Sequence, residues 1–211
     1  MKRAAVHNPQ VHDLLQIDHP SLSSGCAAEP SWVRPTMLDC PWVVVRRSQA
    51  ASDLIAVGVR GENRSERWAA SCEKTMVREI VRPEELRRTS SDVRRTPALR
   101  SLQEMSERWA DLALPWGPGG SVGFELASGR KVTNEASDLD LVIRAQQRIT
   151  VEEARFLLDR TQALEAKVDV RVETPVCGFA LEEYVSASSA KILLRFPDGG
   201  SLGEDPWQEE A

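Results

Sequence analysis

Apolar residues recur along the chain with two different spacings, which predict both strands and helices. Strict alternation at residues 168–172 predicts a half-buried strand in which the valines share one face, and Asp169 and Arg171 share the other. Shorter apolar runs predict four further strands, at residues 42–45, 54–59, 76–81 and 192–194. The short polar link between the first two of these runs is typical of a hairpin.

Apolar residues spaced by three or four predict two amphipathic helices, at residues 97–114 and 151–166. Thr150 is expected to cap the second helix, because Glu153 follows three residues later and completes a capping box. The pattern at residues 122–126 does not decide between helix and strand. Strands and helices in this order predict an α+β fold.

A polar and basic segment at residues 89–96 separates an N-terminal group of strands from the later helices and strands. The length of 211 residues suits one large domain or two small ones. We therefore predict a domain boundary in this segment. It gives an N-terminal domain of residues 1–95 and a C-terminal domain of residues 96–211.

Charge is unevenly distributed along the chain. The formal net charge is −5, yet residues 46–100 hold 13 Lys and Arg against 8 Asp and Glu, so this segment carries +5 and the remainder −10. Such asymmetry is typical of a protein that binds an acidic partner or substrate. A solvated arginine-rich surface is the alternative, and we prefer it for most of these arginines.

Neither a membrane segment nor a secretion signal is visible in the sequence. No apolar run is long enough to span a membrane, and the basic N-terminal residues are not followed by a continuous apolar region. The four cysteines lack C-x-x-C spacing, which argues against a zinc site and gives no disulfide framework. We therefore expect a reduced, cytoplasmic protein.

A glycine-rich turn at residues 117–121 is the first candidate for a binding site. Exposed backbone N–H groups in such a turn can form a nest for an anion, and the hydroxyl of Ser121 adds a donor. Gly119, Gly120 and Ser121 are therefore candidate phosphate-binding residues. Taken alone, the segment is better interpreted as an ordinary turn.

Two aspartates on one predicted strand are the second candidate. Alternation along residues 137–143 places Asp138 and Asp140 side by side on one face, and the apolar residues between them on the other. Neighbouring carboxylates repel each other unless a cation or a proton lies between them. Mg²⁺ fits this position, because it prefers a few carboxylate oxygens together with phosphate oxygens of a substrate. Solvated acids on a surface strand are the alternative.

A cluster of arginines follows the predicted strand at residues 54–59. Arg60, Arg64 and Arg67 carry guanidinium groups whose fork geometry matches phosphate oxygens. Two neighbouring glutamates could instead balance them in a solvated surface cluster. The residues alone leave both interpretations open.

The order of these motifs resembles a known signature. The glycine–serine pair, a spacer and residues 137–141 (SDLDL) are similar to the polymerase-beta-like nucleotidyltransferase superfamily. The longer sequences of residues 116–129 and 137–143 resemble one branch of this superfamily, the malonate decarboxylase holo-acyl-carrier-protein synthases. These enzymes are also called phosphoribosyl-dephospho-CoA transferases. The loops at 20–30 and 197–203 fit this family less well. Other segments that resemble it are residues 12–15, 43–47, 57–61, 64–67, 168–175, 193–195 and 205–207.

The resemblance implies a nucleotidyltransferase-like C-terminal catalytic domain with a mixed sheet and helices, preceded by a smaller α/β N-terminal domain of the same family. It also implies a helix directly after the glycine–serine pair. In the superfamily a third carboxylate comes from a neighbouring strand, and Asp169 fits that place by its order and alternation. Asp138, Asp140 and Asp169 would then be the catalytic residues and the ligands of Mg²⁺ or Mn²⁺. Asp169 could alternatively take the proton of the attacking hydroxyl.

The activity that the resemblance implies is the transfer of 2′-(5″-triphosphoribosyl)-3′-dephospho-CoA to a serine of the apo acyl-carrier subunit of malonate decarboxylase, with release of pyrophosphate. No nucleic acid or membrane partner is implied. Two other functions remain open. One is a metal-dependent nucleotidyltransferase that adds AMP from ATP to a small molecule or a protein. The other is a non-catalytic protein that binds a nucleotide or a carrier through a relic site.

Overall fold

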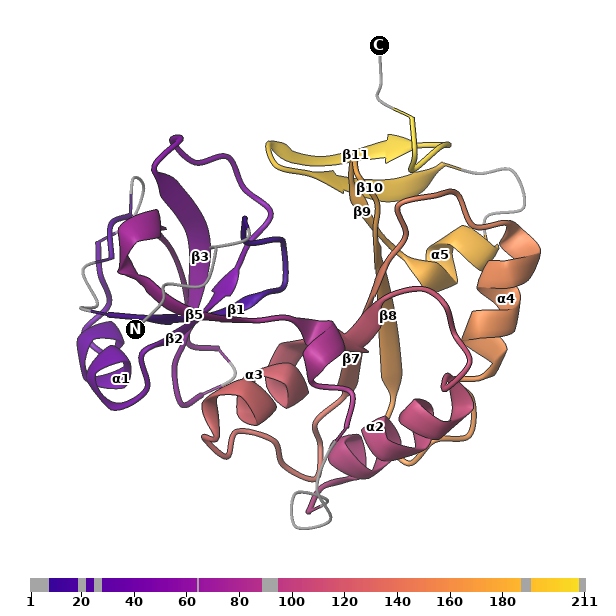
Figure 1. The fold of residues 1–211 in the computed structure, drawn as a ribbon, viewed down its shortest axis with the longest axis horizontal. Helices are drawn as coiled ribbons and strands as arrows, with labels where there is room; N and C mark the ends of the chain where they lie inside the picture. The colour runs from indigo at the N-terminus through magenta and orange to yellow at the C-terminus, as the bar shows by residue number, and fades with distance from the viewer. Residues whose placement is uncertain are drawn as a thin grey trace. The chain divides into compact units, whose positions relative to one another are not determined.

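The computed structural model describes residues 8–18, 22–24, 28–63, 65–88, 95–186 and 191–208. It divides into two compact units, Met1–Arg82 and Pro83–Ala211, which we call unit 1 and unit 2 (Figure 1). The boundary expected from the sequence, between residues 95 and 96, falls later in the chain. It directly follows a segment, residues 89–94, that lies outside the described residues. The α+β class predicted from the sequence is confirmed, because both units contain a sheet and helices.

Unit 1 is built on a sheet in which every described strand pairing is antiparallel. The order of the described strands is β4-β3-β2-β1-β5, and the helix α1 (Val33–Asp39) contributes Val33 and Met37 to the core. The hairpin between the first two predicted strands is confirmed as β2–β3. The strands are β1 (Leu14–Ile17), β2 (Trp42–Val45), β3 (Leu54–Arg60), β4 (Arg67–Glu73) and β5 (Val77–Val81).

Unit 2 contains a mixed sheet, as the family resemblance implied. Among the described residues the strand order is β11-β10-β9-β8-β7-β6, and β7 and β8 run parallel while the other neighbours are antiparallel. The strands are β6 (Trp116–Pro118), β7 (Leu139–Arg144), β8 (Val168–Glu173), β9 (Gly178–Ala180), β10 (Ile192–Phe196) and β11 (Gly199–Gly203).

The helices of unit 2 are shorter than the sequence pattern suggested. The predicted helix at 97–114 ends at Arg108, where Trp109 leaves the helical conformation, and the predicted helix at 151–166 ends at Asp159. Ala163 has a left-handed φ of 58°, which an α-helix cannot continue through. The helical elements of unit 2 are η2 (Pro83–Glu85), α2 (Pro97–Arg108), α3 (Gly120–Ser128), α4 (Val151–Asp159) and α5 (Leu181–Ser186).

Two other expectations for these helices are confirmed. The capping box at the start of α4 is present, because the Glu153 amide donates to the Thr150 hydroxyl and the Glu153 carboxylate accepts from the Thr150 amide. The undecided segment at residues 122–126 is helical and belongs to α3. Within the described ranges, no helix is both long and apolar enough to cross a membrane.

The core of unit 2 forms on one face of the parallel strand pair. Leu139, Leu141 and Ile143 of β7 are completely buried, as alternation predicted, and their register partners on β8 are valines. Two tryptophans lie in the same core, where the rings of Trp109 and Trp116 meet edge to face with centroids 5.0 Å apart. Because this face is fully apolar, the polar residues of both strands must lie on the opposite face.

The C-terminal residues are attached to unit 2 by specific hydrogen bonds. The indole N–H of Trp207 donates to the Ala145 carbonyl at 3.0 Å, and the Thr174 hydroxyl donates to the Pro206 carbonyl at 2.8 Å. The Trp207 ring also packs against Phe179, with ring centroids 5.6 Å apart. The 205–207 segment is therefore an integral part of this unit.

Candidate active site

The parallel pairing of β7 and β8 brings the predicted carboxylates onto one face of the sheet. Asp140 and Asp169 are register partners, so their side chains point to the same side of neighbouring strands. Asp138 directly precedes β7 and lies two residues before Asp140, which places it on that side as well. All three residues are partly accessible to solvent. They occupy the face opposite the apolar core.

The glycine turn lies directly against Asp140. The Gly119 amide donates to the Asp140 carbonyl at 2.9 Å, and α3 begins at the next residue. Gly120 has a left-handed φ of 52°, and a Cβ atom there would lie 1.8 Å from Oδ2 of Asp140. Both the backbone conformation and this close approach require glycine. Ser121 follows in the first turn of α3, whose N-terminus lies beside the carboxylate.

Gly117 has a different role from the one that the glycine-rich sequence suggested. It is part of strand β6, and a Cβ atom on it would lie 1.8 Å from the carbonyl oxygen of Pro83. Its missing side chain makes room for the backbone of η2. The turn that approaches Asp140 is therefore formed by Gly119 and Gly120.

Asp169 has a cationic neighbour on its own strand. Nη2 of Arg171 lies 3.0 Å from Oδ2 of Asp169, and both side chains are partly exposed. An ion pair with this exposure contributes about 0–1 kcal/mol to stability, so the two groups can separate at little cost. Among the residues that the structure describes, no three His, Cys, Asp or Glu side chains are gathered into a ready metal cluster.

The donor set on this face nevertheless suits a hard divalent cation. It consists of carboxylate oxygens, the ligands that Mg²⁺ and Mn²⁺ prefer. The absence of a side chain at Gly120 lets the start of α3 lie directly against the Asp140 carboxylate. Asp138 and Asp140 could hold such an ion, and Asp169 could join them by leaving Arg171.

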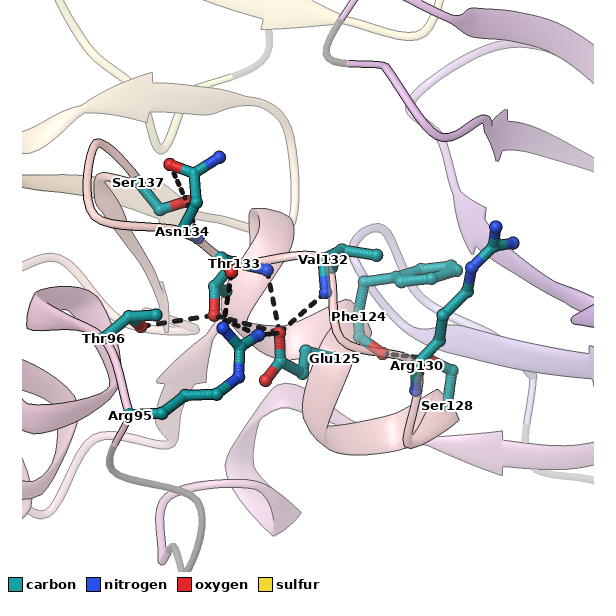
Figure 2. A network of polar contacts seen from close by, with 10 residues as sticks. All are labelled: Arg95, Thr96, Phe124, Glu125, Ser128, Arg130, Val132, Thr133, Asn134 and Ser137. Atoms are coloured by element: carbon teal, nitrogen blue, oxygen red, sulfur yellow. Dashed lines mark hydrogen bonds and ion pairs between the residues drawn. The ribbon is translucent and has the colours of Figure 1, made fainter.

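Glu125 was not found from the sequence, yet it accepts several hydrogen bonds on the helix that begins at the glycine turn (Figure 2). The residue is 5% exposed on α3, and its Oε2 atom accepts from the backbone amides of Val132 and Thr133, both at 2.8 Å. The same oxygen accepts from the Thr133 hydroxyl at 2.9 Å and from Nη2 of Arg95 at 2.6 Å. The signal for it was a glutamate within an otherwise small and apolar helix.

These hydrogen bonds keep Glu125 ionised. Burial raises the pKa of its carboxyl group, but the hydrogen bonds from Thr133, Val132 and Arg95 together outweigh burial, and the pKa lies below its usual value. Charge-assisted hydrogen bonds are stronger than neutral ones. The Glu125 carboxylate therefore holds the backbone of Val132 and Thr133, in the segment between α3 and β7, through charge-assisted hydrogen bonds.

The predicted arginine cluster lies in unit 1, apart in the chain from the carboxylates of unit 2. Arg60 and Arg67 are register partners at the end of the β3–β4 hairpin, where Arg60 is partly buried and Arg67 is exposed. Arg64 lies outside the described residues. The hairpin therefore brings two of the three arginines together.

A helix N-terminus with a glycine turn, next to carboxylates on neighbouring strands, is the arrangement of an enzyme that transfers a phosphate-containing group. Comparison with known proteins agrees with this class. The model of the phosphoribosyl-dephospho-CoA transferase MdcG N-terminal domain matches residues 10–83, and the model of the corresponding C-terminal domain matches residues 85–206. The two matches meet where the structure divides into its two units.

Curated relatives extend over nearly the whole chain, and each is called a phosphoribosyl-dephospho-CoA transferase. The protein of Azotobacter vinelandii (strain DJ) is 37% identical over 96% of this chain and 96% of its own length. The Pseudomonas putida (strain W619) protein is 36% identical over 94% of this chain and 95% of its own length. No solved structure matches the chain significantly. The chain belongs to the phosphoribosyl-dephospho-CoA transferase family and is a transferase.

Proposed function

We propose that this enzyme transfers 2′-(5″-triphosphoribosyl)-3′-dephospho-CoA to a serine of the apo acyl-carrier subunit of malonate decarboxylase and releases pyrophosphate. One observation carries the proposal: the glycine turn at the start of α3 touches Asp140, which is the register partner of Asp169. A phosphate-binding element and two acidic residues are thus contiguous. The substrate and the acceptor follow from the resemblance of residues 116–129 and 137–143 to this family.

The N-terminus of α3 is proposed to bind the triphosphate. The amides at the first turn of a helix are not bonded within the helix, and they face an anion together with the positive end of the helix dipole. Gly119 and Gly120 allow the phosphate to approach the backbone, and the hydroxyl of Ser121 can donate to a phosphate oxygen. This holds the α-phosphorus next to the acidic face of β7 and β8.

Asp138, Asp140 and Asp169 are the proposed ligands of Mg²⁺ or Mn²⁺. A bound divalent ion would neutralise the charge that develops on the triphosphate. The carrier serine oxygen forms the new bond to the α-phosphorus, while the bond from that phosphorus to pyrophosphate breaks. The serine proton passes to solvent or, in the alternative in which Asp169 is not a metal ligand, to the Asp169 carboxylate.

The arginines of unit 1 are proposed to add affinity for phosphate. Arg60, Arg64 and Arg67 can each offer paired N–H donors to an oxyanion. The basic segment 46–100 could also attract an acidic carrier by charge complementarity. We further propose that the reaction takes place in the cytoplasm, with neither a nucleic acid nor a membrane as partner.

Two alternatives are distinguished from this proposal by their products. Transfer of AMP from ATP to another acceptor would use the same acidic face, whereas a relic protein would bind without turnover. The glycine at position 120 favours an active site over a relic, because its contact with Asp140 leaves no room for a side chain.

The direct test is a mass measurement. The protein, Mg²⁺, the triphosphoribosyl precursor and the apo carrier are incubated together, and the carrier is weighed by mass spectrometry. We expect a gain equal to the phosphoribosyl-dephospho-CoA group and an equal amount of pyrophosphate. A carrier in which the acceptor serine is replaced by alanine is the control. An unchanged carrier mass, together with AMP transfer from ATP to another acceptor, would show that the protein is instead a nucleotidyltransferase that transfers AMP.

A further inference from the structure

We infer that Glu125 is a positioning residue, which fixes the segment between α3 and β7 and thereby sets the place of Asp138 at the start of β7. The inference rests on the proposed function in so far as Asp138 is taken to be an active-site carboxylate. Glu125 itself touches no proposed reacting atom. Its effect on the reaction would be transmitted through the backbone of residues 130–137.

The course of the chain creates the need for such a contact. Helix α3 starts at Gly120 beside Asp140 and ends at Ser128, and the next residue, Gly129, adopts a left-handed φ of 73° that turns the chain away from the helix axis. The chain must then return to the start of β7, where Asp138 lies. The described residues between Gly129 and Leu139 belong to no helix or strand, so regular secondary structure does not hold them.

The side chains of Glu125 and Arg95 bind this segment in place of the hydrogen bonds that a regular helix or strand would make. One carboxylate oxygen of Glu125 accepts from the amides of two consecutive residues, Val132 and Thr133. Nη1 of Arg95 donates to the Thr133 carbonyl at 2.8 Å, so both backbone polar groups of Thr133 are held by side chains. The Thr96 and Thr133 hydroxyls lie 3.2 Å apart, which adds a contact to the residue that precedes α2 (Figure 2).

Residues 134–137 form a hydrogen-bonded turn that connects the fixed residues 132 and 133 to Asp138. The amide of Asn134 donates to the Ser137 hydroxyl at 3.0 Å, and the Ser137 amide donates to the Asn134 carbonyl at 3.1 Å. The side-chain oxygen of Asn134 also accepts from the Ala136 amide at 2.9 Å. Backbone groups of residues 132–134, 136 and 137 are therefore hydrogen-bonded, up to the residue that directly precedes Asp138.

Stability alone is a weak reason for a buried charge at this place. Removing the Glu125 carboxylate from water offsets much of what its attraction to the more exposed Arg95 contributes, and an apolar residue of similar volume is often as stable. Arg95 and Glu125 do something that apolar residues could not, because they hold the backbone groups of Val132 and Thr133 in one geometry. Such geometric control is a use that a buried carboxylate can have near an active site.

The test compares a graded set of variants in three measurements. Glu125→Ala removes all the acceptors, Glu125→Gln keeps one neutral acceptor of the same shape, and Thr133→Val removes only the hydroxyl. Glu104→Gln is the matched control, because Glu104 pairs with Arg108 on the exposed side of α2. The measurements are amide hydrogen exchange at residues 130–137, the Kd for Mn²⁺, and kcat and KM for carrier modification.

We expect Glu125→Ala to speed amide exchange at residues 132 and 133 and to lower kcat by about a hundredfold, with KM changed by less than about threefold. The Kd for Mn²⁺ should rise by about tenfold or more, as it does when groups that orient metal ligands are removed. Glu125→Gln should recover most of both losses, and Thr133→Val should have a smaller effect than either. Glu104→Gln should match the wild type throughout.

Each other outcome has a definite meaning. If Glu125→Ala speeds amide exchange at residues 130–137 but leaves the Mn²⁺ affinity and kcat unchanged, Glu125 has only a structural role and the inference is wrong. Unchanged amide exchange in Glu125→Ala would also overturn the inference. A wild type that modifies no carrier but binds Mn²⁺ more tightly than Glu125→Ala would contradict the proposed function and leave the inference standing. A wild type that binds no Mn²⁺ and shows the same kcat as Glu125→Ala would overturn the inference.

Discussion

The two sheets of the molecule bring like charges together in different ways. In unit 1, Arg60 and Arg67 meet across a hairpin, so their proximity follows from a turn of a few residues. In unit 2, Asp140 and Asp169 meet across parallel strands, which must be joined by a crossover, here one that contains α4. The arginine pair thus depends on local structure, and the aspartate pair depends on the tertiary fold.

This difference shows where precise geometry is built into the molecule. The aspartates have a helix N-terminus on one side and a hydrogen-bonded return segment leading into them. The described arginines are placed by a hairpin end and have partly or fully exposed side chains. We therefore expect changes in unit 2 to act on turnover and changes in the arginines to act on affinity. The following predictions test that contrast, beginning with the largest expected effect.

Loss of a carboxylate from the acidic face should have the greatest effect. Asp140→Asn or Asp138→Asn should lower kcat by more than about a hundredfold, because each removes a ligand of a hard cation and both are expected to leave the fold intact. Turnover and circular dichroism are the measurements, with Asp159→Asn on the exposed end of α4 as the control. Activity that survives either change, or that persists in full with EDTA, would contradict the metal assignment.

Substitution of two glycines distinguishes the effect of a steric contact at the site from the effect of backbone strain. Gly120 and Gly129 both have left-handed φ values, but a Cβ atom would meet Asp140 at Gly120 and nothing within 4 Å at Gly129. Alanine at either position should cost about 1–2 kcal/mol of stability through strain. Only Gly120→Ala should also lower kcat, by more than about tenfold.

The comparison uses thermal unfolding and steady-state kinetics on both glycine variants. Ser121→Ala should weaken substrate use only modestly, because it removes one hydroxyl donor and keeps the helix N-terminus. Equal kinetics in Gly120→Ala and Gly129→Ala would show that the phosphate is bound elsewhere.

Acid should weaken unit 2 through Glu125. Because the folded-state pKa of Glu125 lies below its usual value of 4.5, its ionised form contributes stability above about pH 4.5. That contribution is lost as the pH falls through the lower, folded-state pKa. The wild type should therefore lose more stability than Glu125→Gln between pH 6 and about pH 3, as measured by Tm.

Glu165 provides an exposed comparison for this pH experiment. A hydrogen bond from Arg100 lowers the pKa of Glu165, but the pair lies in solvent. Glu165→Gln should change the pH dependence of Tm less than Glu125→Gln does. The opposite ranking would mean that burial adds nothing to the Glu125 network.

The arginines should show the smallest effects. Arg60→Ala should raise the KM for the triphosphoribosyl substrate about three- to tenfold with little change in kcat, since an exposed phosphate contact is weaker than a buried charged hydrogen bond. Arg88→Ala, an exposed arginine outside the hairpin, is the control. If both variants keep the wild-type KM, the hairpin arginines are a solvated surface cluster.

Much of the acidic face could be predicted from the sequence, because alternation is a local property. The positions of Asp138 and Asp140 opposite a leucine-rich core follow from a two-residue period, and the structure agrees. The capping box at Thr150 is also local and was predicted correctly. Strand β4 was missed, because its alternating buried residues include Ala70 and Cys72, which give a weak strand signal.

The remainder depends on contacts between distant parts of the chain. No local pattern joins Arg95 to Glu125 or to Thr133, so the network that holds residues 130–137 is visible only in three dimensions. Gly117 likewise looked like part of the turn, and only the approach of Pro83 shows why it is a glycine. Helix lengths were overestimated because the apolar periodicity continues past Arg108 and Asp159, where α2 and α4 end.

The register of β7 against β8 also bears on how faithfully the molecule folds. A slip of one residue would turn Asp169 and Arg171 into the apolar layer and turn Val170 and Val172 out to water. Such a misaligned chain would lose much of its core and be removed as an unfolded protein before it could bind substrate. Burial of Val170 and Val172 therefore selects the register in which Asp140 and Asp169 are partners, so only chains with aligned aspartates fold stably.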